Sequence, residues 1–238
     1  MKGVILAGGL GSRLFPVTKV VNKHMLPIYN KPMIFYPLNA LISLGIKEIL
    51  VTSSREGVAS LSRLLGSGEE FGVEISYRIQ EKPGGISDAL KLAKGFANNQ
   101  SIAMILGDNI FLSKIDISNF KEGAQIFLKE VDKPEEFGIA EIREGKIINI
   151  EEKPKNPKSN LCVTGLYLYD NTVFSKIKTL KPSARGELEI TDLNNAYLRE
   201  GKLFFSKVDG LWLDAGTDFD ELHQSTKAVK EFQDSQKN

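Results

Sequence analysis

The stretch that decides the fold is Val4-Ile5-Leu6-Ala7-Gly8-Gly9-Leu10-Gly11-Ser12-Arg13-Leu14-Phe15-Pro16. Its first four residues form an apolar run typical of a buried strand, and the glycines follow at once. Glycines directly after a strand let the backbone approach a ligand closely and direct N–H groups at phosphate oxygens. Arg13 adds a cation, so this stretch predicts a phosphate-binding loop. A plain tight turn is the alternative.

Two familiar nucleotide-binding loops do not match this stretch. The Rossmann fingerprint needs a third glycine where Leu14 stands, and an acidic residue about 20 residues further on. The Walker A loop needs Gly-Lys-Ser/Thr, which the sequence lacks. An NAD-binding module is therefore disfavoured. Lys23 follows the loop, and two cations near one loop can neutralise a polyphosphate; a solvated surface lysine is the alternative.

Working outward, short apolar runs alternate with helical patterns through the first half of the chain. We expect strands at 4–7, 46–52, 73–79 and 101–106, and helices at 33–44, 57–65 and 87–96. Gly45 is a natural C-cap for the first of these helices. Strand–helix–strand alternation predicts parallel pairing, with helices covering the sheet.

The second half has a different rhythm. We expect strands at 125–131, 138–142, 146–151, 162–169 and 203–208, helices at 189–199 and 218–232, and a frayed tail after residue 232. Arg143-Glu144-Gly145 predicts a hairpin turn. The fold class expected is α/β, a Rossmann-like three-layer fold with a central mixed, mostly parallel sheet flanked by helices, in a single domain.

Composition excludes several classes of protein. The chain has 238 residues, with 31 Lys and Arg against 30 Asp and Glu, whereas nucleic-acid binders usually carry a basic excess. Its apolar stretches are far shorter than the roughly 18–20 residues of a membrane span, and glycines and Arg13 interrupt the apolar N-terminus, so we expect neither membrane nor export. The single cysteine, Cys162, favours a reducing, cytoplasmic setting, and two histidines argue against a multi-histidine metal site.

Two aspartates stand where sheet edges bind ligands. Asp108 follows the apolar run 101–106, and Asp214 lies in a glycine-punctuated turn after Trp212. Two such carboxylates could share one Mg²⁺ with substrate phosphates. An Asx turn for Asp108 and a helix N-cap for Asp214 are the alternatives. Gln80 also follows a strand, and its amide suits the imide edge of thymine or uracil; an exposed polar residue is the alternative.

Together these motifs resemble the signature of the sugar-1-phosphate nucleotidyltransferases. The resemblance runs in order through nearly the whole chain: Gly8 to Thr18, Lys23 to Pro27, Gln80 to Ile86, Leu106 to Asn109, Glu152 to Pro154, Thr164 to Tyr167, Arg185 to Asp192 and Trp212 to Thr217. It is greatest for a short form of the branch that transfers a thymidylyl group to glucose 1-phosphate.

The resemblance implies a nucleotidyltransferase domain over 1–238, with a mainly nucleotide-binding half (1–110), a mainly sugar-phosphate-binding half (111–217) and a C-terminal helix and tail (218–238). Catalytic residues would be Arg13, Lys23 and Lys153, and Mg²⁺ would be held by Asp108 and Asp214. The nucleotide would be bound by Leu6, Gly8, Gly9, Gly11, Ser12, Arg13, Lys23, Gln80, Pro83, Gly85 and Asp108. The sugar phosphate would be bound by Asn109, Gly138, Glu152, Lys153, Thr164, Tyr167 and Arg185. A solvated charge run is the alternative for 151–153, and a core aromatic for Tyr167.

The implied reaction is attack by a sugar 1-phosphate oxygen on the α-phosphorus of a nucleoside triphosphate, with pyrophosphate leaving. The nucleophile is already an anion near pH 7, so the protein supplies position and positive charge rather than a strong base. We expect dTTP and glucose 1-phosphate, giving dTDP-glucose. A UTP-using or broad-specificity enzyme is the alternative within the family, and a catalytically silent nucleotide-sugar-binding regulator is the alternative from another class.

The sequence departs from the family pattern at a few positions. His24 stands where a glutamine is common, and Ala215 replaces a threonine in the turn after Trp212. The chain stops soon after the helix that begins near Asp218. The role of His24, a secondary nucleotide site and a homo-oligomer are therefore left open.

Overall fold

The computed structural model describes residues 1–82 and 84–237. Contacts divide the chain into two compact units. The loop unit comprises Gly3–Lys82, Ile105–Ile115 and Asp209–Asn238, and the hairpin unit comprises Met1–Lys2, Pro83–Met104 and Asp116–Val208. The segments 105–115 and 209–238 thus return to the unit that carries the glycine-rich loop. The single domain and its two sequential halves stay a prediction.

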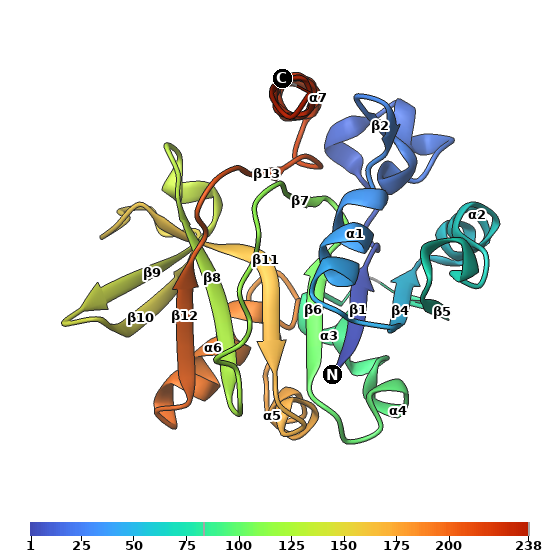
Figure 1. Ribbon diagram of the computed structural model, residues 1–238. Coiled ribbons are helices and arrows are strands. Elements are labelled where there is room, and N and C mark those ends of the chain that lie inside the picture. Colours follow the sequence, from blue (N-terminus) through green and yellow to red (C-terminus); the bar gives the residue numbers. More distant parts are fainter. Residues whose placement is uncertain (83, 238) are drawn as a thin grey trace. The chain divides into compact units, whose positions relative to one another are not determined.

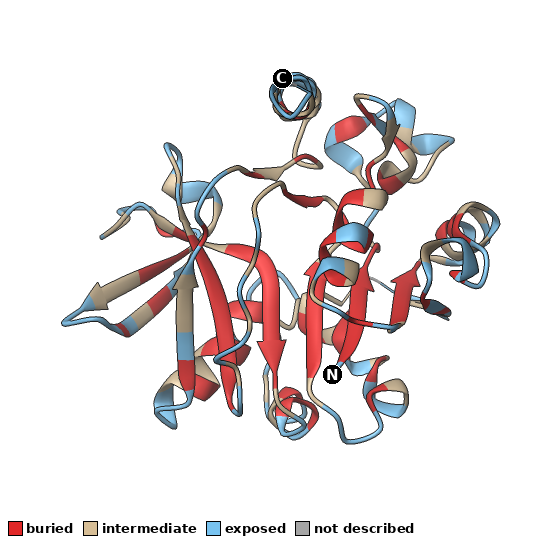
Figure 2. Cartoon of the chain, viewed as in Figure 1, coloured by how far each residue is buried: buried red, intermediate tan, exposed pale blue. Residues whose placement is uncertain are grey.

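The loop unit is built on parallel strands. β1 (Lys2–Leu6) pairs with β4 (Glu48–Ser53), and β4 pairs with β5 (Glu74–Ile79), all in parallel. Every residue of β1 is buried, as expected for a parallel strand covered on both faces (Figure 2). The alternation of strands and helices therefore predicted this pairing correctly.

The helices between these strands begin and end at recognisable signals. α1 (Phe35–Ser43) is followed by Gly45 at φ +78°, the left-handed conformation expected after a helix C-terminus. α2 (Arg55–Leu65) begins two residues before the expected Gly57, because the Ser54 hydroxyl accepts the Gly57 N–H at 3.1 Å. The connecting segments add the short helices η1 (Ser12–Leu14), η2 (Val17–Lys19), η3 (Lys23–Met25) and η4 (Glu69–Phe71).

The rest of the loop unit contains elements too short for the sequence pattern to reveal. β2 (Pro27–Ile28) pairs with β3 (Lys31–Pro32), and β7 (Asn109–Phe111) pairs with β13 (Trp212–Asp214), both antiparallel. α7 (Phe219–Ser235) then begins at its N-cap Asp218 and extends three residues beyond the expected end (Figure 1). It packs Val229 into a cluster with Ile28, Met33, Tyr36, Ile110 and Ala215.

The hairpin unit is mainly antiparallel. β9 (Gly138–Arg143) pairs with β10 (Lys146–Glu152) through the expected turn, where Glu144 and Gly145 have φ of 50° and 73°. β11 (Leu161–Tyr169) pairs antiparallel with β9 and with β8 (Ala124–Glu130). β12 (Leu203–Lys207) pairs parallel with β8, and β6 (Ile102–Leu106) has residues in both units.

Among its described residues, the hairpin unit has the short helix η5 (Pro134–Glu136) and four α-helices. The α-helices are α3 (Ile86–Lys91), α4 (Lys94–Ala97), α5 (Val173–Ile177) and α6 (Ile190–Arg199). The single helix expected at 87–96 is wrong. Leu92 and Ala93 donate to carbonyls three residues earlier, at 3.2 and 3.0 Å, and this tightened turn separates α3 from α4.

The expected fold class is confirmed: a mixed, mostly parallel central sheet flanked by helices.

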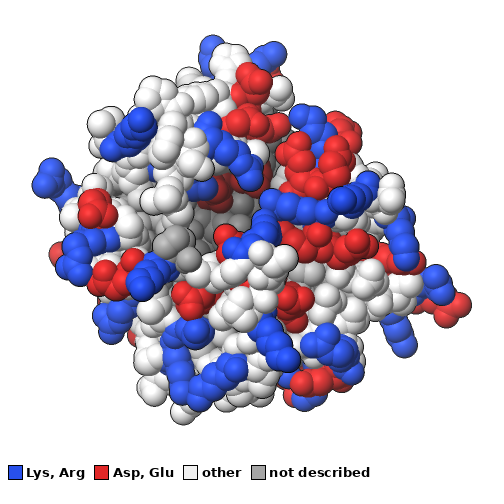
Figure 3. Space-filling model, turned by 180° about the vertical axis from the view of Figure 1, so that it is seen from behind, with Lys and Arg blue, Asp and Glu red and all other residues white. Residues whose placement is uncertain are grey.

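Cys162 is buried in β11. Within residues 1–82 and 84–237, we find no helix that combines the length and apolar character needed to cross a membrane. On the face shown in Figure 3, basic and acidic side chains are interspersed.

Candidate nucleotidyl-transfer site

The glycine-rich loop leaves β1 and is anchored on both sides. The Leu14 side chain is fully buried, and the Thr18 hydroxyl donates to the Gly11 carbonyl at 2.7 Å. Gly11 has φ +60°, a conformation that a side chain would strain. Ser12 and Arg13, between these anchors, are exposed. The backbone of the loop is therefore fixed on both sides of Arg13, whose side chain is exposed to solvent.

His24 lies in η3, in the segment that follows this loop. It is buried, and its Nδ1 donates to Asn22 Oδ1 at 2.8 Å, while the Asn22 amide donates to Ser53 Oγ at 3.3 Å. The Ser53 hydroxyl in turn donates to the Ala7 carbonyl at 2.6 Å. Burial, with the neighbouring Lys23 charge, lowers the pKa of His24 to about 3. His24 is thus a neutral link that joins the Lys23 segment to the strand ends.

Asp108 and Asp214 are brought together by the β7–β13 pair. Asn109 lies opposite Asp214 in that pair, and the Ala215 N–H donates to the Asp108 carbonyl at 3.0 Å. The Lys23 ammonium donates to Asp108 Oδ2, and the two side chains are only 16% and 14% exposed. Lys23 is therefore not a solvated surface lysine; it is the counter-ion of the aspartate pair.

The electrostatics of this cluster follow from its burial. Burial alone would raise the pKa of Asp108, but the Lys23 ammonium outweighs burial and holds the pKa well below its usual range. For Asp214, burial and the Asp108 charge raise the pKa to about 7, and they outweigh the Lys23 charge and the Gly216 N–H, which act in the opposite direction. Burial would also lower the pKa of Lys23, yet Asp108 raises it. When both carboxylates are ionised, their two negative charges exceed the single positive charge of Lys23.

Sequence reasoning did not predict the part that Gly216, Trp212 and Asn109 play in supporting Asp108. A Cβ at Gly216 would lie 2.6 Å from Asp108 Oδ2, so only glycine fits beside the carboxylate. The Asn109 amide donates to Asp108 Oδ1 at 3.2 Å and accepts from the Trp212 indole N–H at 2.8 Å. Asn109 is buried, and these bonds hold Asp108 in place. The expected sugar contact of Asn109 stays a prediction. The feature of the sequence that could have indicated the role of Gly216 is its place two residues after Asp214.

Gln80 lies over the start of the loop. Its backbone N–H donates to the Ser53 carbonyl at 2.8 Å, immediately after β5. A Cβ at Gly8 would lie 2.8 Å from Gln80 Oε1, so the missing side chain at Gly8 makes room for this amide. Leu6 is buried, and its carbonyl accepts the Gly107 N–H at 2.9 Å. Pro83, also expected to bind nucleotide, lies outside the described residues.

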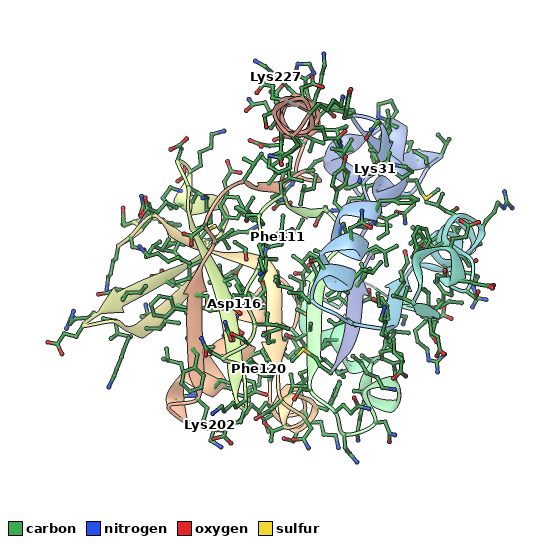
Figure 4. All side chains as sticks on the ribbon, viewed as in Figure 1. Lys31, Phe111, Asp116, Phe120, Lys202 and Lys227 are labelled. Atoms are coloured by element: carbon green, nitrogen blue, oxygen red, sulfur yellow. The ribbon has the colours of Figure 1, made fainter. Side chains whose placement is uncertain are left out.

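The loop unit therefore gathers most of the expected nucleotide and metal residues around strand ends. They are Leu6, Gly8, Gly9, Gly11, Ser12, Arg13, Lys23, Gln80, Asp108 and Asp214. Phe111, labelled in Figure 4, ends β7 and is buried. Among the described residues, no three side chains of the His, Cys, Asp and Glu types gather to hold a metal.

The expected sugar residues belong to the hairpin unit, except Asn109, which lies in the loop unit. Glu152 ends β10. Glu152 lies opposite Gly138, and a Cβ at Gly138 would stand 3.4 Å from Glu152 Oε2. The Thr191 hydroxyl donates to Oε2 at 2.6 Å, and Arg185 Nη2 donates to Oε1 at 3.4 Å. Glu152 is thus held by two side chains rather than left as a solvated charge.

Arg185 is bound more closely by Glu189, which sequence reasoning missed. Arg185 Nε and Nη2 donate to the two Glu189 oxygens at 3.2 and 2.9 Å, and the Ser183 hydroxyl donates to Glu189 Oε1 at 2.6 Å. Burial alone would lower the pKa of Arg185, but Glu189 and Glu152 raise it. The two acidic residues Glu187 and Glu189, close to Arg185 in the chain, were the feature of the sequence that could have indicated this ion pair.

Three remaining residues differ in their access to a ligand. Lys153 is exposed. Its φ of +45° is uncommon for a residue with a side chain, and the hydrogen bond from its N–H to the Phe137 carbonyl, at 3.0 Å, stabilises this conformation. Thr164 and Tyr167 are buried. The Thr164 hydroxyl donates to the Phe127 carbonyl at 2.9 Å, and Tyr167 stacks on Tyr169 at 6.0 Å. Tyr167 therefore has the environment of a core aromatic.

Comparison with known proteins identifies the class. The profile of the nucleotidyl transferase family matches residues 2–231. The chain belongs to this family and is a nucleotidyltransferase, an enzyme of nucleotide-sugar biosynthesis. Members of this family generally use a divalent metal ion. The resemblance seen in the sequence is thereby confirmed.

Relatives narrow the class further. The chain is 46% identical, over 99% of its length and 85% of the relative's, to a glucose-1-phosphate thymidylyltransferase from Neisseria meningitidis. It is 43% identical to one from Xanthomonas campestris, over 98% of this chain and 81% of that protein. A crystal structure from Bacillus anthracis, described as a glucose-1-phosphate thymidylyltransferase in complex with sucrose, superposes with a TM-score of 0.91 at 51% identity, over 96% of this chain and 94% of the other. A UDP-glucose pyrophosphorylase complexed with UDP-glucose shares the fold, with a TM-score of 0.84 at 23% identity, over 97% of this chain and 98% of that one.

Proposed function

We propose that the chain transfers a thymidylyl group from dTTP to glucose 1-phosphate, giving dTDP-glucose and pyrophosphate. The observation that carries the reaction type is the partly buried pair Asp108 and Asp214 with Lys23 as its counter-ion. The near-full-length likeness to glucose-1-phosphate thymidylyltransferases supports the choice of substrates.

The nucleotide would be bound by the loop unit. The N–H groups of Gly8, Gly9 and Gly11 would approach the phosphates, and the exposed Arg13 would stabilise the charge that develops on the α-phosphate and on the leaving pyrophosphate. The Gln80 amide, lying over Gly8, would donate to and accept from the imide edge of thymine.

Asp108 and Asp214 fit a divalent cation. Burial and, after it, the negative charge of Asp108 raise the pKa of Asp214 to about 7, and a cation between the two carboxylates would offset both effects. Mg²⁺ prefers one or two carboxylates together with phosphate oxygens and water. We therefore propose Mg²⁺, which would supply positive charge to the reacting phosphates, with Asp108 and Asp214 as its protein ligands. Lys23 would hold Asp108 in place.

The sugar phosphate would be bound by the hairpin unit. Glu152, oriented by Thr191, would accept hydrogen bonds from sugar hydroxyls with its remaining lone pairs. The exposed Lys153 and the outward part of the Arg185 guanidinium would hold the anionic phosphate and align its oxygen for in-line attack. No general base is required, because the attacking phosphate is an anion near pH 7.

A pyrophosphate-release screen tests this function. The purified chain with Mg²⁺ is given dTTP, UTP, CTP, GTP or ATP against several hexose 1-phosphates. We expect the highest kcat/KM for dTTP with glucose 1-phosphate. Faster turnover with UTP would replace the proposed nucleotide, and no release from any pair would refute the function.

The enzyme's substrates and its one buried cysteine favour the cytoplasm as its location.

A further inference from the structure

Two segments of the hairpin unit are bonded to each other along their backbones. The Leu188 N–H donates to the Gly84 carbonyl at 2.9 Å, and the Ser87 N–H donates to the Leu188 carbonyl at 3.2 Å. Segment 84–88 contains Gly85, which is expected to reach the base. Segment 183–189 contains Arg185, which is expected to reach the sugar phosphate. Backbone hydrogen bonds therefore join the segment predicted to reach the base to the segment predicted to reach the sugar phosphate.

Close packing reinforces these bonds. Gly85 has φ +90°, and a Cβ there would lie 2.8 Å from the Leu188 carbonyl oxygen and 3.0 Å from the Glu187 Cβ. Gly85 is thus required for contact between the segments, in addition to any contact with the base. Ser87 is fully buried, and its hydroxyl donates to the Glu189 carbonyl at 3.0 Å.

The Glu189 side chain extends this connection to the sugar residues. It is only 11% exposed, and both of its oxygens accept from the Arg185 guanidinium, which is 48% exposed. Arg185 in turn donates to Glu152. A continuous set of contacts therefore leads from Gly84 and Gly85, through Leu188 and Glu189, to Arg185 and Glu152.

We propose that Ser87 and Glu189 are positioning residues that couple nucleotide binding to sugar-phosphate binding, an inference that rests on the proposed function. A nucleotide that orders segment 84–88 also orders segment 183–189 through these bonds. The sugar phosphate then binds side chains whose conformational freedom is already lost, so its affinity rises. Linkage requires that the sugar phosphate raise nucleotide affinity by the same factor.

Calorimetry on the full chain with Mg²⁺ measures this coupling. The probes are glucose 1-phosphate and the α,β-methylene analogue of dTTP, whose bridging carbon prevents transfer. The coupling factor is the Kd of glucose 1-phosphate alone divided by its Kd with saturating analogue. In Ser87→Ala we expect this factor to fall about two- to tenfold, the range for one lost hydrogen bond, with the Kd of each ligand alone close to wild type. Ser87→Thr, which keeps the hydroxyl, restores the factor.

Glu189→Gln tests the other end of the network. Loss of its charge releases Arg185, so the Kd of glucose 1-phosphate alone rises roughly tenfold or more, while the Kd of the nucleotide analogue alone is unchanged. The coupling factor of Glu189→Gln, which we also expect to fall, decides the question if Ser87→Ala does not fold. A residue that only stabilised the fold would weaken both ligands together.

Ser159→Ala is the matched control, because Ser159 also donates to a backbone carbonyl, that of Ala140 at 2.6 Å, within the same unit. We expect wild-type coupling there. Wild-type coupling in Ser87→Ala, unchanged affinities in Glu189→Gln, or an equal loss in Ser159→Ala would overturn the inference while pyrophosphate release continued. Absence of pyrophosphate release from the wild-type chain with every substrate pair would remove the proposed function and this inference together.

Discussion

Arg13 is the exposed cation of the anchored loop, and its removal tests the role of that loop. In Arg13→Ala we expect kcat for pyrophosphate release to fall by roughly 10²–10³, the effect of removing one donor that stabilises transition-state charge. Stability should change little, because Arg13 is exposed. Arg63→Ala, which removes an exposed arginine from α2, serves as the control. Unchanged turnover in Arg13→Ala would exclude the assigned role.

Asp108 combines a proposed metal ligand with a buried ion pair. Asp108→Asn should abolish Mg²⁺-dependent pyrophosphate release. It should also lower the free energy of unfolding by about 1–3 kcal/mol, because Lys23 is left buried without its partner. The double variant Lys23→Met with Asp108→Asn should recover much of that stability and none of the activity. Urea unfolding and steady-state assays check both, and an Asp108→Asn variant that turned over normally would place the metal elsewhere.

His24 makes stability depend on pH in a definite direction. Its pKa is about 3 in the folded chain and 6.5 in the unfolded chain, so between these values only the unfolded state is protonated. Stability is therefore lost as the pH falls through this window. From pH 7.5 to 5.5, wild type should lose about 1.4 kcal/mol of unfolding free energy more than His24→Gln does.

Urea unfolding of both proteins at the two pH values measures this difference. Asp214, whose pKa is raised, gains stability as the pH falls, but it does so in both proteins, so the comparison isolates His24. Equal pH dependence of wild type and His24→Gln would show that His24 is not held neutral.

At the scale of elements, the site depends on β7, β13 and α7. β7 and β13 hold Asn109 opposite Asp214, and α7 packs Val229 into the cluster that contains Ile110 and Ala215. Ala215, next to Asp214, and Ile110, two residues after Asp108, are thus part of the cluster that packs against Val229 of α7. Sequence periodicity revealed α7, which is long, but not β7 or β13, which are three residues each.

Removing packing from α7 tests this dependence. Val229→Ala should cost roughly 1–3 kcal/mol, because two buried methyl groups are lost and a cavity is left. For a chain of this size that is a drop of several degrees in Tm. Val20→Ala is the control, because Val20 is 91% exposed and its loss should change Tm by about 1–2 °C at most. A Val229→Ala protein as stable as this control would show that α7 contributes little to the unit.

At the scale of the whole molecule, contacts do not follow the order of the chain. The predicted halves at 1–110 and 111–217 are sequential, whereas the loop unit takes in 105–115 and 209–238 as well. Hydrophobic runs indicate where strands lie, but their spacing does not encode which distant segments pack together. For the same reason, the network from Ser87 through Glu189 to Glu152 was not visible in the sequence.

The sequence by itself determined the glycine-rich loop, most strand and helix positions, the hairpin turn at 143–145 and the family. Each of these depends on local backbone conformation, on periodicity along the chain, or on the order of motifs. Only the tertiary structure decided that Lys23 neutralises Asp108, that Asp214 has a raised pKa, that Glu189 holds Arg185, and that Thr164 and Tyr167 are buried. These depend on which side chains meet in a low-dielectric interior, and that is set by packing between segments far apart in the chain.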